Sequence, residues 1–358
     1  MSDRIVYGEE GVSAAVEILR DGGVVGLPTE TVYGLAGDAF QPMAVARIFE
    51  AKGRPLTDPL IVHLPEAGWL DRVALFASHE QRQLVEALAA AFWPGPLTLL
   101  LPKHPDLPDL VTAGSDRVAV RVTAHPLFQE VLRRLDSPLA APSANRFGSI
   151  SPTSANDVQI ELGDMILLIL DGGPCEHGME STLVAVDVDT HVNMVDEREG
   201  TSLSLSILRP GPITKAQLLQ YGHVVSPERI VNSPGSLPGH YAPKKRLQII
   251  DPDIKGLIPN PSAAPTASIG YLAFTPPSQE FIKGCAAIEI LSPTGNIEEA
   301  AANFYGALRR LDMSKSDMIY AESLPEVGIG VAIMDRLRRA SYGSNHGAGH
   351  HSSETSAS

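Results

Sequence analysis

The chain has 358 residues, 44% of them hydrophobic, so its length suits two domains and leaves enough apolar residues for a sizeable core. Its formal net charge is -14, and a surface of that sign repels nucleic-acid phosphate overall, so any contact with a polyanion must be local. Only two cysteines occur, which favours a reducing compartment over a disulfide framework. No apolar run has the length of a membrane span or a signal peptide, so we expect a cytoplasmic protein without a membrane partner.

Helical and strand-like patterns alternate along the first part of the chain, which is typical of α/β construction. Strand patterns occupy residues 24–28, 59–64, 97–102, 117–122, 138–143 and 165–171. Helices are predicted over Ser13–Asp21, Met43–Lys52, Glu80–Phe92, Pro126–Leu135 and Ser154–Leu162, the last capped by a Ser or Thr. Two more strand patterns, 181–189 and 203–210, follow without a clear helix between them. A mixed sheet is therefore favoured over a purely parallel one.

A second, smaller unit begins after a short helical pattern at 214–222 and a Pro/Gly-rich stretch at 233–246. Strand patterns at 247–251, 267–274, 286–291 and 317–323 alternate with helical ones at 296–311 and near 328–340. The predicted boundaries are 1–213 for the first domain, 214–246 for a linker, 247–343 for the second domain and 344–358 for a polar, disordered tail.

The segment from Pro28 to His63 gathers the groups that bind small ligands. A hydroxyl-rich turn, Thr29 to Tyr33, follows an apolar strand, and a second strand ends in His63. Between them a predicted helix ends in Lys52, Gly53 and Arg54. In isolation this tripeptide indicates a helix C-cap, with Gly in the left-handed conformation. The same cap would also direct two cations toward the strand ends, where they could hold phosphate oxygens.

Later segments repeat this arrangement of polar groups after strands. Arg121 lies in a strand among valines, so it must reach water or meet an anion. Residues 141–153 and 171–182 are loops of small, hydroxyl and glycine residues that suit either a helix cap or an anion-binding nest. Cys175 and His177 suggest a nucleophile or a metal pair, but two ligands do not make a zinc site. A P-loop, a dinucleotide fingerprint, a GxSxG elbow and an HExxH motif are all missing from the sequence.

Jointly, these motifs resemble the YrdC-like family, the threonylcarbamoyl-AMP synthases. The resemblance rests on PTETVYGLAG, KGRPLTDPLIVH, RVAVRV, APSAN, SISPT, DGGPCEHGMESTLV and ILRPG, and it covers Gly8 to Ile213 in order. The remainder, with SPGSLPGHYAPKKR and ESLPEVGIGVAIMDRLRRAS, resembles the linker and C-terminal domain of the long, two-domain form. The resemblance implies an open twisted mixed sheet with a cavity, plus a Rossmann-like second domain.

The implied reaction joins L-threonine, bicarbonate and ATP into threonylcarbamoyl-adenylate and pyrophosphate, with Mg²⁺ accompanying ATP. A separate transferase would then move the threonylcarbamoyl group to tRNA, next to the anticodon, so tRNA is only an indirect partner. The resemblance places Thr31, His63, Arg121, Ala141 and Ser181 around L-threonine. It places Lys52, Arg54, Asp58, Arg117, Ser143, Asn145, Ser151, Arg209 and Tyr241 around ATP, with Lys52 and Arg54 stabilising the reacting phosphates. It assigns no protein side chain to a metal and no base to the threonine amine.

Two positions depart from the family pattern. Asp58 stands where Asn is more usual, which puts a carboxylate near phosphates, and Asp335 similarly replaces a frequent Asn in the second domain. The linker is expected to fold over the mouth of the site as a lid, with Tyr241 supplying an apolar plate and a hydroxyl. Two other readings stay open: a non-catalytic RNA-binding or ribosome-assembly module, and a hydrolase that depends on Cys175.

Overall fold

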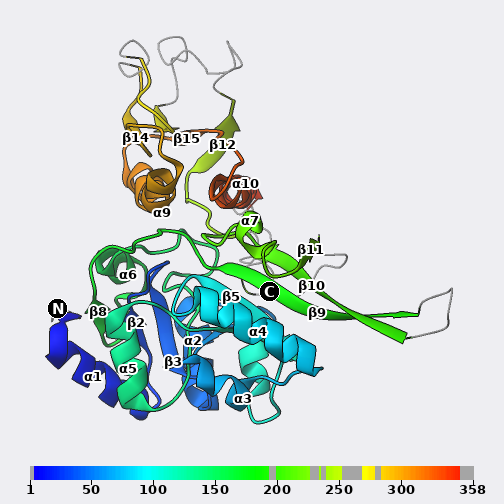
Figure 1. Ribbon diagram of the computed structural model, residues 1–358. Helices are drawn as coiled ribbons and strands as arrows, with labels where there is room; N and C mark the ends of the chain where they lie inside the picture. Colours follow the sequence, from blue (N-terminus) through cyan, green and yellow to red (C-terminus); the bar gives the residue numbers. More distant parts are fainter. Residues whose placement is uncertain are drawn as a thin grey trace, which may run out of the picture. The chain divides into compact units, whose positions relative to one another are not determined.

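The computed structural model describes residues 4–192, 199–225, 234, 239–251, 268–278 and 284–346. These residues form two compact units (Figure 1). The first unit lies within residues 1–146 and 152–236, and the second within 147–151 and 237–358. In the described part of the chain, no helix has both the length and the apolar character needed to cross a bilayer.

A mixed sheet of eleven strands forms the centre of the first unit, as far as it is described. In spatial order the strands are β1 (Ile5–Tyr7), β8 (Ile169–Asp171), β2 (Val25–Leu27), β3 (Gly34–Asp38), β7 (Leu139–Ala140), β4 (Ile61–His63), β6 (Arg117–Arg121), β5 (Leu97–Pro102), β9 (Thr182–Val192), β10 (Glu199–Arg209) and β11 (His223–Val225). The sheet contains parallel pairs, such as β4 with β6, and antiparallel pairs, such as β5 with β6. The predicted mixed sheet is confirmed.

Helices cover the sheet of the first unit on both faces. They are α1 (Gly8–Arg20), α2 (Pro42–Lys52), α3 (Leu70–Val73), α4 (His79–Phe92), α5 (Pro126–Leu135), α6 (Ala155–Leu162) and α7 (Lys215–Leu218), with the 3-10 turns η1 (Ala67–Trp69) and η2 (Asp109–Thr112). Val25 and Leu27 of β2 pack in one apolar cluster with α1 and α5. Gly26, between them, faces Val158 of α6. This alternation follows from the two-residue period of a strand.

The end of α2 and the start of α6 form the caps that the sequence predicts. Gly53 ends α2 with φ 60°, in the left-handed region, and Lys52 occupies the last turn. Ser154 caps α6 by accepting from the backbone N–H of Asp157, whose carboxylate accepts in return from the Ser154 N–H. The two caps fix where the loops at 53–59 and 143–153 begin or end.

Several boundaries differ from the prediction. α1 begins at Gly8, five residues before Ser13, because Glu9 and Glu10 suit its first turn and Val12 is buried. β3 was not predicted, since its sequence GLAGD has low strand propensity, yet all five residues are buried. The expected linker, 214–246, contains α7 and β11, and β11 pairs in parallel with β10.

Within its described residues, the second unit has a four-stranded parallel sheet in the order β12 (Arg246–Ile250), β15 (Met318–Glu322), β13 (Ile269–Ala273) and β14 (Ala287–Ile290). The described helices α9 (Ile297–Met313) and α10 (Gly330–His346) pack against it and against each other. This agrees with the smaller α/β domain predicted from the sequence. The predicted tail is wrong at its start, because Ser344 lies inside α10 and its Oγ accepts from the Leu247 N–H at 3.0 Å. Residues 347–358 lie outside the described residues.

Candidate active site

Neighbouring strand ends in the first unit bring His63, Arg121 and Ala141 together. β4 and β6 run parallel, and their last residues, His63 and Arg121, are register partners. On the other side of β4, the backbone N–H of Ala141 donates to the Ile61 carbonyl at 2.9 Å. All three residues are buried. Strand ends of open α/β sheets are common ligand sites, and three of the predicted threonine residues share this one.

The turn after β2 brings Thr31 and Glu30 to the same place. Nη1 of Arg121 donates to Thr31 Oγ1 at 3.0 Å, and Nη2 lies 2.6 Å from Glu30 Oε1. Thr123 donates to the other carboxylate oxygen of Glu30. Thr29 holds the turn in shape, because its Oγ1 accepts from the backbone N–H of Thr31 at 3.0 Å. The anion that a buried strand arginine requires is therefore Glu30.

Glu30 is a functional candidate that sequence reasoning missed, because a Glu in a hydroxyl-rich turn indicates only a turn or cap former. Burial raises the pKa of Glu30, but the charge of Arg121 and the Thr123 hydroxyl outweigh it and hold that pKa below its ordinary value. The carboxylate is therefore ionised at neutral pH. The signal that could have found it was the isolated Arg121, since Glu30 is the acidic residue of the hydroxyl-rich turn.

His63 is neutral, and its ring packs against a neighbouring aromatic side chain. Its ring stacks on Phe128, with centroids 4.9 Å apart and planes at 26°. Burial and the nearby charge of Arg121 lower the pKa of His63 to about 3. Nδ1 of His63 and Nε of Arg121 are buried and find no hydrogen-bond partner in the described part of the chain. An unpaired buried polar atom is costly, so both atoms are suited to a polar ligand.

Ser181 lies just before β9, two strands away from Arg121, with Thr98 of β5 between them. The hydroxyls of Ser181 and Thr98 are 2.7 Å apart. Arg209, at the end of β10, donates from Nη2 to the Ser181 hydroxyl at 3.0 Å and to its carbonyl at 3.1 Å. The sheet thus brings one predicted ATP residue, Arg209, directly onto one predicted threonine residue, Ser181.

Lys52 connects the end of α2 to the loop after β7. Its Nζ donates to the carbonyl oxygen of Ser143 at 2.6 Å and also to that of Asn145. Burial and the positive charge of Arg54 hold the pKa of Lys52 well below its ordinary value. An incoming anion would raise this pKa again, so a bound phosphate would favour the charged form of Lys52.

Arg54 and Asp58 form a buried ion pair, with Nη2 2.9 Å from Oδ2. Arg54 also donates from Nε to the Asp58 carbonyl at 3.0 Å and from Nη2 to the Pro59 carbonyl at 2.7 Å. The carboxylate whose role the sequence leaves open therefore has a cationic partner four residues before it. Together the pair shapes the loop from residue 54 to 59.

Arg117 lies at the opposite end of β6 from Arg121. Its guanidinium lies 2.8 Å from Asp187 and donates to the Leu100 carbonyl at 3.0 Å. Asn145 lies in the first unit, where its side-chain amide donates to the Arg146 carbonyl at 2.9 Å. The structure therefore groups Asn145 with Lys52 but does not bring Arg117 to the strand ends of His63 and Arg121.

Ser151 and Tyr241 belong to the second unit, and both are buried there. Tyr241 adopts φ 68°, in the left-handed region, which is rare for an aromatic residue. Its ring centroid lies 5.8 Å from that of Tyr305, and the Arg336 guanidinium sits 5.2 Å from it. The expected lid residue is thus firmly packed within the second unit.

The glycine loop after β8 is held against Tyr33. The Tyr33 hydroxyl donates to the Gly173 carbonyl at 2.7 Å and accepts from the Gly172 N–H at 3.1 Å. A Cβ at Gly172 would lie 2.5 Å from the His125 ring and 2.7 Å from Pro28, so only glycine fits. The loop is linked to the turn that carries Glu30, since the His177 N–H donates to the Glu30 carbonyl at 2.9 Å.

Cys175 in this loop is a poor nucleophile. Its side chain is buried, and burial raises the pKa of its thiol above the ordinary value. Within the described residues, no group of three or more His, Cys, Asp or Glu side chains is arranged to hold a metal ion. The geometry therefore argues against a hydrolase that depends on Cys175.

Fold and site together define a class: α/β proteins that hold small polar ligands at the strand ends of a mixed sheet, beside a cationic helix end. Residues 17–200 match the Sua5/YciO/YrdC family model, described as telomere recombination. Residues 213–341 match the model described as the threonylcarbamoyl-AMP synthase C-terminal domain. The chain belongs to the long, two-domain threonylcarbamoyl-AMP synthase family.

Full-length relatives support this assignment. The threonylcarbamoyl-AMP synthase of Bacillus subtilis (strain 168) is 37% identical over 361 residues, covering 96% of each chain. That of Pyrococcus abyssi (strain GE5 / Orsay) is 35% identical over 350 residues, covering 92% of this chain and 94% of its own. The crystal structure of P. abyssi Sua5 complexed with L-threonine has a TM-score of 0.79 and 32% identity, and covers 95% of this chain and 97% of its own.

Proposed function

We propose that this chain is a threonylcarbamoyl-AMP synthase, a nucleotidyltransferase that forms threonylcarbamoyl-adenylate and pyrophosphate from L-threonine, bicarbonate and ATP. One observation carries the proposal: Thr31, His63 and Arg121 meet at two neighbouring strand ends, where His63 Nδ1 and Arg121 Nε are buried without a hydrogen-bond partner among the described residues. The nearly full-length match to a protein solved with L-threonine supports it.

L-threonine carries a carboxylate, an ammonium and a hydroxyl, and the proposed residues offer partners for the carboxylate and the hydroxyl. Arg121 is the natural clamp for the carboxylate, because its planar fork makes charge-assisted hydrogen bonds. The neutral His63 and the hydroxyls of Thr31 and Ser181 suit the threonine hydroxyl, which both donates and accepts. The Ala141 backbone supports the amino acid from the β7 side. Glu30 holds Arg121 in position through their ion pair.

Five of the ATP-binding residues proposed for the first unit lie in the segments at the end of α2 and at 143–145, namely Lys52, Arg54, Asp58, Ser143 and Asn145. Lys52 and Arg54 would stabilise the charge that builds up on the phosphates, and Asp58 would orient Arg54. Ser143, Asn145 and Arg209 would hold the nucleotide from neighbouring loops and strands. For Arg117, Ser151 and Tyr241 the proposed ATP contact rests on the family resemblance.

The chemistry has two bond-forming steps. The threonine amine attacks bicarbonate and forms a carbamate with loss of water. An oxygen of that carbamate then attacks the α-phosphorus of ATP, and the bond to pyrophosphate breaks. A rigid site that orients three reactants lowers the entropy cost of both steps. Mg²⁺ would arrive on the ATP phosphates and neutralise charge on the leaving pyrophosphate.

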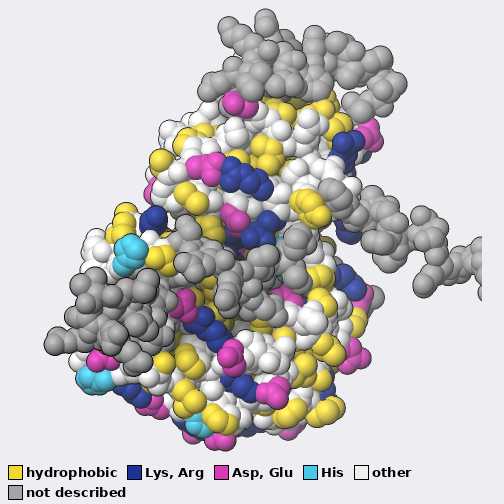
Figure 2. All heavy atoms as spheres, turned by 90° about the vertical axis from the view of Figure 1, so that its right-hand side faces the viewer, with side chains coloured by type: hydrophobic (Ala, Val, Ile, Leu, Met, Phe, Trp, Pro, Cys, Tyr) yellow, Lys and Arg dark blue, Asp and Glu magenta, His cyan; other side chains and the backbone are white. Residues whose placement is uncertain are grey.

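The product would serve a separate transferase that passes the threonylcarbamoyl group to the adenosine next to the tRNA anticodon. We propose that the enzyme works in the cytoplasm, where tRNA and reduced cysteines are found. A purely RNA-binding module is disfavoured. On the face shown in Figure 2, the described Lys and Arg side chains are interspersed with Asp and Glu and form no single patch.

The experiment that tests this function measures pyrophosphate release from ATP with L-threonine and bicarbonate supplied together and separately. The proposal expects release only with both. Mass spectrometry of the product should show the mass of threonylcarbamoyl-adenylate. With ¹³C-bicarbonate that mass should rise by about one mass unit, because the product keeps one carbon atom from bicarbonate.

A further inference from the structure

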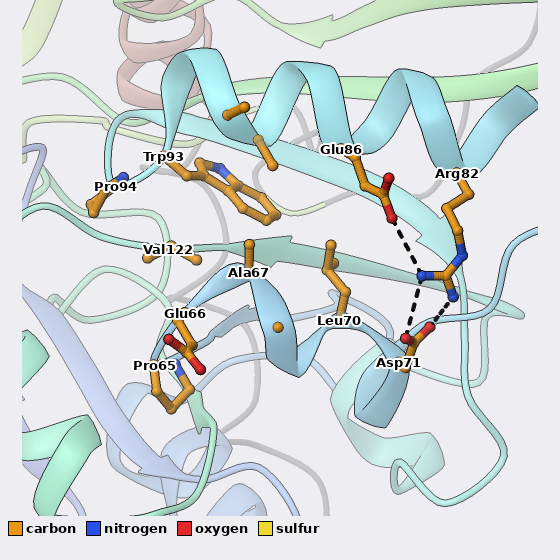
Figure 3. Close-up of a pocket in the computed structure, with 13 residues that line it drawn as sticks. Pro65, Glu66, Ala67, Leu70, Asp71, Arg82, Glu86, Trp93, Pro94 and Val122 are labelled. Atoms are coloured by element: carbon orange, nitrogen blue, oxygen red, sulfur yellow. Dashed lines mark hydrogen bonds and ion pairs between the residues drawn. The ribbon is translucent and has the colours of Figure 1, made fainter.

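A pocket of about 470 Å³ lies in the first unit, between the η1–α3 segment and α4 (Figure 3). A pocket of this size can hold a small organic molecule. No residue of the candidate active site lines it. The lining residues are Pro65, Glu66, Ala67, Gly68, Leu70, Asp71, Arg82, Glu86, Ala89, Ala90, Trp93, Pro94 and Val122.

The walls of the pocket are largely apolar. Leu70, Ala89 and Val122 are buried residues, and Trp93 contributes an indole ring at one end. The indole N–H donates to the Leu97 carbonyl at 2.7 Å, so this donor is already used. What Trp93 offers a ligand is therefore its ring surface, which attracts apolar groups and cations.

Charge is unevenly distributed along the pocket. At the end away from Trp93, Arg82 forms ion pairs with Asp71 and, at 3.5 Å, with Glu86. The guanidinium of the lining is thereby neutralised. Glu66 is an exposed residue on the wall opposite Trp93, and none of the interactions drawn between the lining residues in Figure 3 involves it. The lining carries three carboxylates against one guanidinium among its described residues, so it favours a positively charged occupant.

We propose that this pocket binds an organic cation, a primary or secondary ammonium carried on a flat apolar body. The ammonium would sit between the Glu66 carboxylate and the face of Trp93, where ionic and cation–π attraction act together. The apolar body would lie along Leu70 and Ala89. The opposite orientation is disfavoured, because the carboxylates at that end, Asp71 and Glu86, are already paired with Arg82.

The pocket borders the backbone that carries His63 and Arg121, two of the residues proposed to bind L-threonine. Val122 directly follows Arg121, and Pro65 comes two residues after His63. The N–H of Leu64, between them, donates to the Arg121 carbonyl at 2.8 Å. A ligand in the pocket would therefore contact Pro65 and Val122, which follow the two strand ends. We expect its binding to change the apparent KM for L-threonine more than that for ATP, a part of the inference that rests on the proposed function.

Phenethylamine is a suitable probe, with phenylacetate and 2-phenylethanol as anionic and neutral controls. Calorimetry on the full chain should give a Kd of roughly 1 mM or below, since a fragment of about nine non-hydrogen atoms can reach that affinity. Glu66→Gln should weaken binding roughly tenfold, whereas Glu17→Gln, on the exposed face of α1, should not change it. Amide NMR shifts should centre on residues 65–71 and 82–94.

The binding arm needs no turnover, so it stands or falls independently of the proposed function. Failure to bind at millimolar concentration, parent-like binding by the Glu66→Gln variant, or equal affinity for 2-phenylethanol would each overturn the cation site. If phenethylamine binds as expected and threonylcarbamoyl-adenylate is formed, an unchanged KM for L-threonine would refute the coupling alone.

Discussion

Glu30 and Arg121 form a buried ion pair, Oε1 to Nη2 at 2.6 Å, that joins the turn after β2 to the end of β6. The same guanidinium reaches Thr31, and the same carboxylate accepts from Thr123. Glu30 and Thr31 together therefore fix the orientation of the Arg121 guanidinium, which is the proposed partner of the threonine carboxylate. Substitution of either partner of the ion pair should weaken the binding of L-threonine more than the binding of ATP.

Glu30→Gln should raise the KM for L-threonine roughly tenfold or more and leave the KM for ATP nearly unchanged. Gln keeps the shape of the side chain but removes the charge that orients Arg121, and charged hydrogen bonds contribute about 1.5–3 kcal/mol. Steady-state pyrophosphate release measures both constants. Glu17→Gln on α1 is the matched control. Equal changes in both KM values would show that Glu30 acts only through general stability.

Arg121→Ala and Arg54→Ala should separate the two substrates. Loss of the Arg121 fork should mainly impair L-threonine binding, and loss of Arg54 should mainly weaken ATP binding, each by about 1.5–3 kcal/mol. Because Arg54→Ala alone leaves Asp58 buried without its cation, Arg54→Ala with Asp58→Asn is the cleaner variant. Calorimetric titration with each ligand tests the split. Parent-like binding of both ligands would assign the two arginines to structure alone.

His63 should make the protein less stable as pH falls from 6.5. Its folded pKa of about 3 lies below the ordinary 6.5, so the unfolded chain binds the extra proton in that window. The free energy of unfolding should therefore drop by up to about 1.4 kcal/mol per pH unit from this residue. Denaturant unfolding of the parent and His63→Gln between pH 6.5 and 5 isolates the contribution of His63, because other groups are shared. Parallel pH curves would contradict it.

Tyr241 offers a test of the expected lid. Its ring packs with Tyr305 and under Arg336, so Tyr241→Ala should destabilise the second unit by about 3 kcal/mol. Tyr241→Phe keeps the ring and removes only the hydroxyl. If the hydroxyl contacts a phosphate, Tyr241→Phe should raise the KM for ATP while thermal unfolding changes little. An unchanged KM, with no protection of the linker (214–246) from proteolysis by ATP and L-threonine, would argue against a lid.

Much of the fold could be predicted because its signals are local. The end of α2 at Gly53 and the start of α6 at Ser154 follow from cap chemistry within a few residues. The strands of β4 and β6 show as short apolar runs. β3 gave no such signal, because glycine and alanine are placed there by tertiary burial and not by strand propensity.

The site was predictable in its residue types but not in its pairings. Arg121 in an apolar strand indicated that an anion must lie nearby. Only the folded position of the turn after β2, beside the end of β6, shows that Glu30 supplies it. Asp58 follows Arg54 by four residues, a spacing that predicts an ion pair only within a helix. Here α2 has already ended, and a loop brings the two side chains together. Contacts between distant segments depend on topology, which a local pattern does not encode.

The most direct test of the central claim is the dependence of pyrophosphate release on both co-substrates. With purified full-length chain, ATP and Mg²⁺, release should require L-threonine and bicarbonate together, and L-threonine should not be replaced by L-valine, which lacks the hydroxyl that His63 and Thr31 would bind. We expect only background release when either co-substrate is omitted. Equal release without L-threonine or without bicarbonate would contradict it and indicate a plain nucleotide hydrolase.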